Sequence, residues 1–167
     1  MAWSIPKADP TVAWAAGLFD GEGCISIGRT RNAKAVGRPA QCRLFYIPRL
    51  LVRMTSVGSL RHFQRAFHAG TISGPELNPR HITYRPVYTW SIRTRDGIQT
   101  ILMAMLPYLT VKRREALLML QFLRISIPRD ETSRYSVQQQ RQREKLYWRL
   151  RAAKKDYDGQ READPLA

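Results

Sequence analysis

The sequence predicts an α+β fold in a single domain, and three observations support this. Apolar residues at helical spacing, apolar residues alternating with polar ones, and glycines or prolines at the breaks recur along the 167-residue chain. Their order is helix, two strands, helix, two strands, then further helices. This length suits one domain with a real core. We expect one domain over 1–167, with a core of about 9–127, a basic helical extension of about 128–157 and a disordered tail over 158–167.

The first helix is expected to begin near residue 10. Asp9 followed by Pro10 is typical of a helix start, because a carboxylate caps the first amides and proline fits the first helical position. The segment VAWAAGLF is apolar nearly all round, so this helix should be buried on more than one side. Gly17 and Gly21 stand four residues apart and share a face where another backbone can approach closely. Gly21 and Gly23 are expected to end the helix in the left-handed cap conformation.

Two strands of a basic hairpin should follow. In CISIGRTR, Ile25 and Ile27 occupy one face of the first strand and small or polar residues the other. The second strand is expected in CRLFYIPRLLVRMT, where Pro48 indicates a bulge or an edge. A helix is expected over 57–68, with Gly70 as its stop.

The second half of the chain reads as another strand pair followed by helices. TISG and VYTWSIRT are the two strands. Asp96 is expected to cap a helix that Pro107 breaks, and a second apolar helix resumes in VKRREALLML and continues to the next proline. The charged tail should form a helix packed through three side chains, Leu146, Tyr147 and Leu150.

The charge of the chain indicates a polyanionic partner. The sequence has 28 Lys and Arg against 13 Asp and Glu, a net charge of +15 and a pI near 10.7. The excess is mostly arginine, whose planar fork suits phosphates and guanine edges. The positive residues are spread through segments expected to fold, which favours a nucleic acid over a lipid surface.

The sequence also excludes some classes. Its longest apolar runs fall short of the about 18 residues that a membrane span needs, and its first residues lack the pattern of a signal peptide. We therefore expect an intracellular protein, in a bacterial cytoplasm or an organelle such as a chloroplast or mitochondrion. Cys24 and Cys42 are too few for a disulfide framework or a zinc site, so buried thiols are expected.

The segment AAGLFDGEG, from Ala15 to Gly23, resembles the motif that names the LAGLIDADG homing endonucleases. Two further stretches are similar to that family: VRMT before a helix ending in FHAGTI, and TWSI with the later LPYLTVKRREALLML. Together these segments cover about residues 9–125. The resemblance implies the αββαββα fold of that family, with an antiparallel β-sheet as a DNA-binding saddle and, in this chain, additional C-terminal helices.

The resemblance implies a site-specific, double-stranded DNA endonuclease of the single-motif type. Such an enzyme hydrolyses phosphodiester bonds in a long, near-palindromic target, leaves staggered breaks with short 3′ overhangs, and so initiates intron mobility. One motif in one chain implies a homodimer, with Ala13, Gly17, Asp20 and Gly21 at its interface. Two alternatives stay open, namely an intron RNA maturase that uses the same saddle and a DNA-binding regulator derived from a degenerate nuclease.

By its position in the motif, Glu22 is the expected metal-binding carboxylate, with Gly21 beside it. Two such carboxylates close together repel each other, and divalent cations with phosphate oxygens relieve that repulsion. Mg²⁺ suits hard oxygen ligands and phosphate chemistry and is the expected cofactor. Asp20 points about 200° away around the helix. We therefore expect Asp20 to have a structural task, such as bonding backbone amides near the partner helix.

Two cations complete the expected catalytic set. Lys112 matches a family lysine that polarises the attacking water or neutralises phosphate charge. The alternative for Lys112 is an exposed basic residue at a helix start. Arg53, at the end of the second strand, is the other candidate, and a bulge there would bring Met54 to its place.

Sequence recognition should come from the strand pairs, because a two-stranded ribbon fits the major groove. Many arginines would contact phosphates, and these contacts give affinity that falls steeply with salt. The charge of the C-terminal extension could lengthen this contact, but packing on the back of the saddle is the expected role. The predicted DNA-binding residues are Ser26, Gly28, Arg29, Thr30, Arg31, Asn32, Lys34, Arg38, Arg43, Tyr46, Arg49, Arg85 and Arg93.

Overall fold

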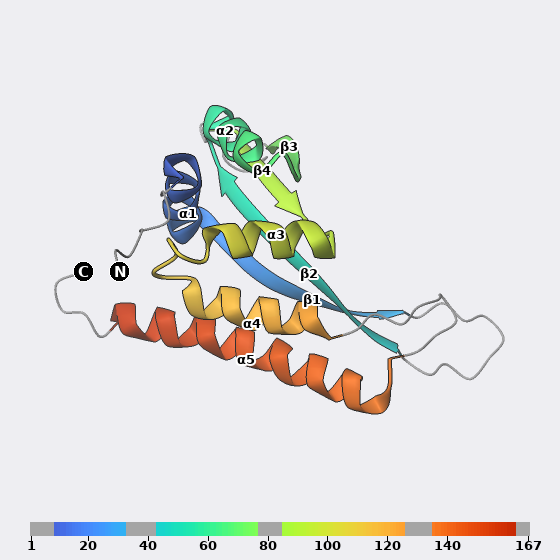
Figure 1. Ribbon diagram of the computed structural model, residues 1–167. Helices are drawn as coiled ribbons and strands as arrows, with labels where there is room; N and C mark the ends of the chain where they lie inside the picture. Colours follow the sequence, from blue (N-terminus) through green and yellow to red (C-terminus); the bar gives the residue numbers. More distant parts are fainter. Residues whose placement is uncertain (1–8, 33–42, 77–84, 126–134, 163–167) are drawn as a thin grey trace, which may run out of the picture. The chain divides into compact units, whose positions relative to one another are not determined.

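A computed structural model gives the fold of the chain (Figure 1) and describes residues 9–32, 43–76, 85–125 and 135–162. The elements are, in order, α1 (Pro10–Glu22), β1 (Gly23–Asn32), β2 (Arg43–Met54), α2 (Val57–Phe67), β3 (Thr71–Glu76), β4 (Val87–Ile92), α3 (Arg95–Met105), α4 (Arg113–Arg124) and α5 (Val137–Glu162). The four strands form one sheet in the order β1-β2-β4-β3, in which β4 is antiparallel to both β2 and β3. The predicted α+β class and the order of helices and strands are confirmed.

The chain divides into two compact units, which are described separately. The first unit comprises Met1–Cys24 and Leu50–Arg113, and so contains α1, α2, β3, β4 and α3. The second unit comprises Ile25–Arg49 and Arg114–Ala167, and so contains most of β1, the first part of β2, and the helices α4 and α5. None of the described helices is long and apolar enough to cross a membrane.

In the first unit, α2 covers one face of the sheet and leaves the other face open. α2 packs on β3 and β4, and α1 packs on α2 and α3. Trp90 is fully buried, with its ring edge-on to Phe63 at a centroid distance of 4.8 Å. Its indole nitrogen donates to the carbonyl oxygen of Ala69 at 2.9 Å. Val52 and Ile72 pair with Trp90 across the strands, so these three residues mark the core face.

Helix α1 begins as predicted but ends differently. The carboxylate of Asp9 accepts hydrogen bonds from two amides of the first turn, at 2.9 and 3.3 Å, and Pro10 takes the first helical position. Gly23 caps the other end with φ −76° and ψ 156°, an extended conformation, and Gly21 lies inside the helix. The prediction of a left-handed cap is therefore wrong. Gly23 has another reason to be glycine, because an added Cβ would lie 2.4 Å from the carbonyl oxygen of Phe19.

Other breaks in the sequence agree in part with the structure. Helix α2 ends close to the predicted residue, with His68 at φ 48° and Gly70 at φ 82°. The pairing of β2 with β4 ends at Leu50, opposite Ile92. Pro48 lies beyond this pairing, which agrees with its predicted place at an edge. Asp96 does not cap α3, because Thr94 is the N-cap residue and no side chain caps that end.

In the second unit, α4 and α5 lie side by side (Figure 1). The ammonium of Lys154 on α5 lies 3.9 Å from the carboxylate of Glu115 on α4. Of the residues expected to pack the tail helix, Tyr147 and Leu150 are buried and Leu146 is half-buried. Helix α5 extends to Glu162, so its last turns continue into a segment that the sequence predicted to be disordered. Cys24 is half-buried, and Cys42 lies outside the described residues.

Candidate active site and nucleic-acid interface

Glu22 is the last residue of α1, and its side chain is exposed. The carbonyl end of a helix carries a partial negative charge, and the last turn of α1 contains no basic residue. A carboxylate at such an end costs about 0.3–1 kcal/mol of helix stability. The position of Glu22 therefore suits the binding of a cation better than the support of α1.

Asp20 connects α1 to the segment just before α4. Its carboxylate accepts hydrogen bonds from the backbone amides of Thr110, Val111 and Lys112 at 2.7, 3.2 and 2.9 Å, and from the Thr110 hydroxyl at 2.9 Å. Partial burial alone would raise the pKa of Asp20, but these hydrogen bonds outweigh it and lower the pKa below its usual value. Asp20 thus bonds backbone amides, as expected, and they belong to its own chain. Its place at a dimer interface stays a prediction.

Lys112 is held beside the carbonyl end of α1. Its ammonium donates a hydrogen bond to the carbonyl oxygen of Asp20, and the side chain is half-buried. The carbonyl that Lys112 binds is two residues before Glu22 in the chain. Lys112 stands directly before α4, as the alternative of an exposed basic residue at a helix start has it, but its side chain is half-buried, and its catalytic role stays a prediction. The Glu22 carboxylate and the Lys112 ammonium, both predicted to act in catalysis, thus belong to or contact the last turn of α1.

Arg53 lies on the open face of the sheet in the first unit. The register from Leu50 to Met54 runs without a shift, so Arg53 and not Met54 points to this face. The guanidinium of Arg53 lies 2.5 Å from the carboxylate of Glu76, and the two side chains are 56% and 53% exposed. Sequence reasoning did not identify Glu76, because its strand is joined to β2 only through β4. The catalytic role of Arg53 stays a prediction.

The hairpin of the second unit also has two distinct faces. Ile25 and Ile27 of β1 are buried, as the alternation predicted, whereas Gly28 and Thr30 are exposed and Ser26 is half-buried. On β2, the exposed or half-buried side chains at alternate positions are Phe45, Ile47 and Arg49. The hairpin therefore presents a mixed polar and apolar surface on one face.

Two residues predicted to bind DNA lie on the opposite face of this hairpin. Tyr46 is 3% exposed, and its ring centroid lies 5.6 Å from that of Tyr147 on α5. The guanidinium of Arg29 lies 5.9 Å from the ring centroids of both Tyr147 and Trp148. Both side chains lie against rings of α5, and their contact with DNA stays a prediction. These contacts help to attach the hairpin to α5, with Tyr46 buried and Arg29 exposed.

The remaining predicted residues differ in how far the structure describes them. Gly17 and Gly21 on α1 are exposed and Ala13 is half-buried. Arg85 and Arg93, which flank β4, are exposed. For the residues at the hairpin end, only the strand backbone is described: Arg31, Asn32 and Arg43. Lys34 and Arg38 lie outside the described residues.

The donors at the end of α1 fit a magnesium ion only in part. Within the described ranges, no three His, Cys, Asp or Glu side chains cluster closely enough to hold a metal. Mg²⁺ needs fewer protein ligands, because it keeps several waters and takes one or two carboxylates together with substrate phosphates. An exposed Glu22 carboxylate beside the backbone carbonyl of Gly21 supplies hard oxygen donors of this kind. One chain therefore offers part of a magnesium site.

Comparison with known proteins identifies the fold. No family model and no curated protein matches the sequence. Among solved structures, the archaeal intron-encoded homing endonuclease I-Vdi141I complexed with DNA is similar, with a TM-score of 0.68 and 14% identity over 87% of this chain and 84% of that one. The homing endonuclease I-CvuI in complex with the I-CreI target gives a TM-score of 0.58 and 20% identity over 84% of this chain and 94% of that one.

A longer protein matches through part of its length. The LAGLIDADG homing endonuclease I-SmaMI bound to cleaved DNA has a TM-score of 0.61 and 16% identity over 84% of this chain but 43% of that one. At these identities the likeness is one of fold. The chain has the α+β fold of the LAGLIDADG homing endonucleases, and the resemblance in the motif is confirmed at that level.

Proposed function

We propose that this chain is a metal-dependent, site-specific DNA endonuclease that acts as a homodimer on a long, near-palindromic duplex. The observation that carries the proposal is the exposed Glu22 carboxylate at the end of α1, with the Lys112 ammonium hydrogen-bonded to the same turn. A carboxylate placed where the helix gains nothing from it, next to a fixed cation, suits a site that binds metal and phosphate.

The expected metal is Mg²⁺, held by Glu22 and the backbone of Gly21. When bound, it would lower the pKa of a water molecule and stabilise charge on the attacking and leaving oxygens. Lys112 would place a positive charge near the scissile phosphate, and its contact with the Asp20 carbonyl limits the positions it can take. Arg53 would contribute a second cation from the open face, after exchanging Glu76 for a phosphate. Its high exposure makes that exchange inexpensive.

A homodimer follows from the count of carboxylates. Each strand cut needs a metal-binding carboxylate, and one chain offers one Glu22. Gly17 and Gly21 are exposed on α1, and apart from their chain neighbours and the nearby backbone of α1 no described atom lies within 4 Å of a Cβ added at either. This face can therefore accept a second helix at close range. The chain matches nearly the full length of I-CvuI but less than half of I-SmaMI, as expected for one of two equivalent halves.

Target recognition is assigned to the open faces of the strands. Exposed Gly28, Thr30 and Arg93 would reach base edges or phosphates. Half-buried Ser26 on β1 and Arg49 on β2 would add to these contacts. Symmetric halves would read a near-palindromic sequence. By the resemblance, the breaks are staggered and serve intron mobility. An intron RNA maturase or a DNA-binding regulator with the same fold would lack metal-dependent cleavage.

Cleavage of a randomised library of palindromic and near-palindromic duplexes in the presence of Mg²⁺ tests the proposal. The wild-type chain should cut both strands at one recurrent sequence, and Glu22→Gln should bind that sequence without cutting it. Asp96→Asn is the matched control, because it removes an exposed carboxylate at the start of α3. Tight binding without cleavage by the wild-type chain would overturn the proposal in favour of a maturase or a regulator.

A further inference from the structure

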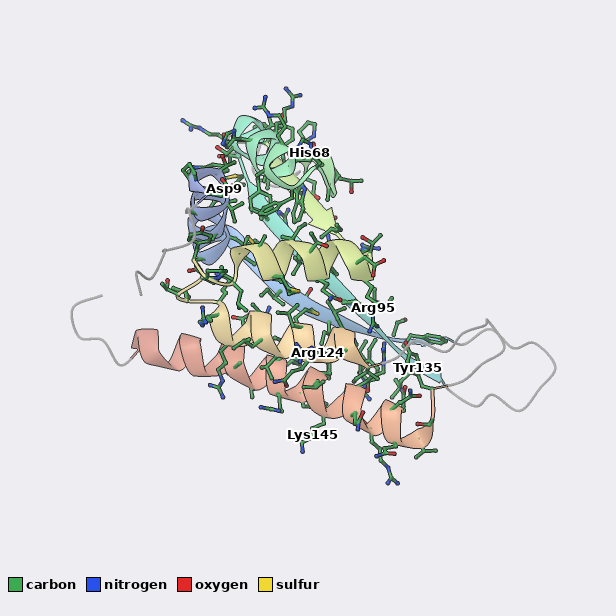
Figure 2. The ribbon with its side chains drawn as sticks, in the orientation of Figure 1. Asp9, His68, Arg95, Arg124, Tyr135 and Lys145 are labelled. Atoms are coloured by element: carbon green, nitrogen blue, oxygen red, sulfur yellow. The ribbon has the colours of Figure 1, made fainter. Side chains whose placement is uncertain are left out.

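The outer side of α5 carries an exposed row of cations around an exposed tryptophan. Arg141, Lys145 and Arg149 follow one another at four-residue intervals, so they lie on one side of the helix with a rise of about 6 Å between neighbours. All three are exposed, and Lys155, also exposed, lies two turns after Trp148 on the same side of α5. Figure 2 shows the Lys145 side chain pointing away from α4. Among the α5 side chains that the structure describes, Glu144 is the single acid, and it is half-buried.

Trp148 lies in the middle of this row. Half of its surface is exposed, although a large apolar side chain is usually buried. Its ring is edge-on to Tyr147 at 5.0 Å, and the guanidinium groups of Arg29 and Arg151 lie 5.9 and 5.8 Å from its centroid. These contacts cover part of the ring, and the other half of the Trp148 surface stays accessible to a ligand.

The opposite side of α5 fixes the helix to the hairpin of the same unit. Arg143 is 6% exposed, donates to the carbonyl oxygen of Tyr46 at 2.7 Å and lies 4.5 Å from the ring centroid of Phe122. Gln140 donates to the carbonyl oxygen of Leu44 at 3.0 Å. The cationic row is therefore turned away from the hairpin face that carries Gly28 and Thr30. A duplex lying on that face of the hairpin would not reach the row.

We propose that the outer side of α5, namely Arg141, Lys145, Trp148, Arg149 and Lys155, is a second nucleic-acid-binding site that takes a single strand. The cations would bind successive phosphates, and the open surface of Trp148 would stack one unpaired base. Aromatic stacking together with a basic track is the general way in which proteins bind single strands without reading their sequence. The bases of a duplex are stacked on one another and offer no face to Trp148.

A lipid surface fits these observations less well. An interfacial helix turns its apolar side outward into the lipid, whereas Tyr147, Leu150 and Ala153 are buried against the rest of the unit. The exposed charges on the outer side of α5 are cationic, with the indole of Trp148 among them. This combination favours an anionic strand that also offers flat aromatic groups.

Fluorescence anisotropy of the full chain with labelled short oligouridine and oligodeoxythymidine tests the inference. Trp148→Ala should weaken binding about tenfold, as expected for one lost stacked base, and Trp148→Phe should retain most of the affinity. Lys145→Gln/Arg149→Gln should make the slope of log K against log salt shallower by about 1.4, because each phosphate contact to a single strand contributes about 0.7. Equal binding of oligouridine and oligodeoxythymidine would support the inference. Tighter binding of one of them would support it as well and would identify the preferred sugar.

Arg61→Gln/Arg65→Gln is the matched control, because it removes two exposed cations at the same spacing from α2. It should change binding little. The inference is overturned if the control weakens binding as much as the α5 double variant, if Trp148→Ala binds as the wild type does, or if a duplex binds equally tightly with the same dependence on Trp148. Thermal melts check that each variant folds. The test requires no cleavage, so its outcome is independent of the proposed endonuclease activity.

Discussion

Asp20 and Lys112 bind each other's backbone. The carboxylate of Asp20 accepts the amide of Lys112 at 2.9 Å, and the Lys112 ammonium donates to the carbonyl oxygen of Asp20. The first contact satisfies an amide just before α4, and the second satisfies a carbonyl at the end of α1. One pair of residues thus fixes both the chain segment that carries Lys112 and the direction of its charge.

Replacing Asp20 should make the chain less stable and change its response to acid. Asp20→Asn keeps the shape but loses the charge that strengthens the hydrogen bonds to residues 110–112, at a cost of about 1–3 kcal/mol at neutral pH. The folded-state pKa of Asp20 is lowered, so its contribution is present above its usual value of 3.8 and is lost as the pH falls through the lower folded value. Urea unfolding from neutral pH down to the acid limb should show a smaller loss of stability in Asp20→Asn than in the wild type.

Asp96→Asn provides the comparison for this prediction. Asp96 is likewise an acid in a helical segment, but it is exposed, and no hydrogen bond from it to the 110–112 segment exists in the described part of the chain. It should leave the stability at neutral pH within about 0.5 kcal/mol of the wild type. Equal losses in the two variants would show that the amide contacts of Asp20 contribute no more than a surface charge.

Local patterns in the sequence predicted the local structure well. The capping of α1 by Asp9 and Pro10 and the alternation of Ile25 with Ser26 depend on residues close in the chain, and both are observed. Arg29 shows the limit of this reasoning. It shares the alternation of Ile25 and Ile27 and lies on their face of β1, where it is exposed and its guanidinium lies near the rings of Tyr147 and Trp148. Its charge predicted DNA binding, which stays a prediction, and its aromatic partners on α5 could not be placed from the sequence.

In the candidate site, too, the residues could be predicted from the sequence but their long-range contacts could not. The motif and its spacing identified Glu22, Asp20 and Lys112, but not the contacts between them. The partners of Asp20 lie 90 to 92 residues later in the chain, and no periodic pattern links positions that far apart. The salt bridge of Arg53 with Glu76 was missed for the same reason, because it depends on a strand order in which β4 lies between β2 and β3.

Removing the charge of Lys112 should slow cleavage more than it weakens binding. Lys112→Met is expected to lower the single-turnover cleavage rate about 100-fold or more, the usual cost of losing one preorganised group that stabilises transition-state charge. The affinity for DNA should fall only by the equivalent of one phosphate contact. Rates in excess enzyme and gel-shift affinities separate the two effects.

Arg61→Met is the control for this variant, since Arg61 is an exposed cation on α2 that belongs to neither proposed site. It should leave the cleavage rate unchanged. A loss of binding in Lys112→Met that fully accounts for its loss of cleavage would contradict a role in the chemical step. A thermal melt shows whether losing the contact with the Asp20 carbonyl has unfolded the chain.

Gly23 should be intolerant of a side chain even though its backbone angles are ordinary. In Gly23→Ala the new Cβ would lie 2.4 Å from the carbonyl oxygen and 2.5 Å from the ring of Phe19, a fully buried residue. Relieving this overlap should cost about 1–3 kcal/mol, in the range of overpacked cores. Gly58→Ala on α2, where the new Cβ would lie 4.0 Å from the Ser56 hydroxyl, should be neutral or slightly stabilising. Chemical denaturation of the two variants measures the difference, and similar stabilities would contradict the packing argument.

Gly17 should tolerate a side chain in the single chain but not in the proposed dimer. A Cβ at Gly17 has no neighbour within 4 Å, and leucine is a better helix former than glycine, so Gly17→Leu should leave the chain folded and no less stable as a monomer. Leucine would, however, hold a second α1 helix away from the close approach that exposed glycines permit. Sedimentation equilibrium should therefore show a weaker dimer in Gly17→Leu, and double-strand cleavage should fall in step with it, because each chain brings a single Glu22. Ala152→Leu changes an exposed position on α5 in a comparable way and should leave the dimer intact. A Gly17→Leu dimer as tight and as active as the wild type would place the proposed interface elsewhere on the chain.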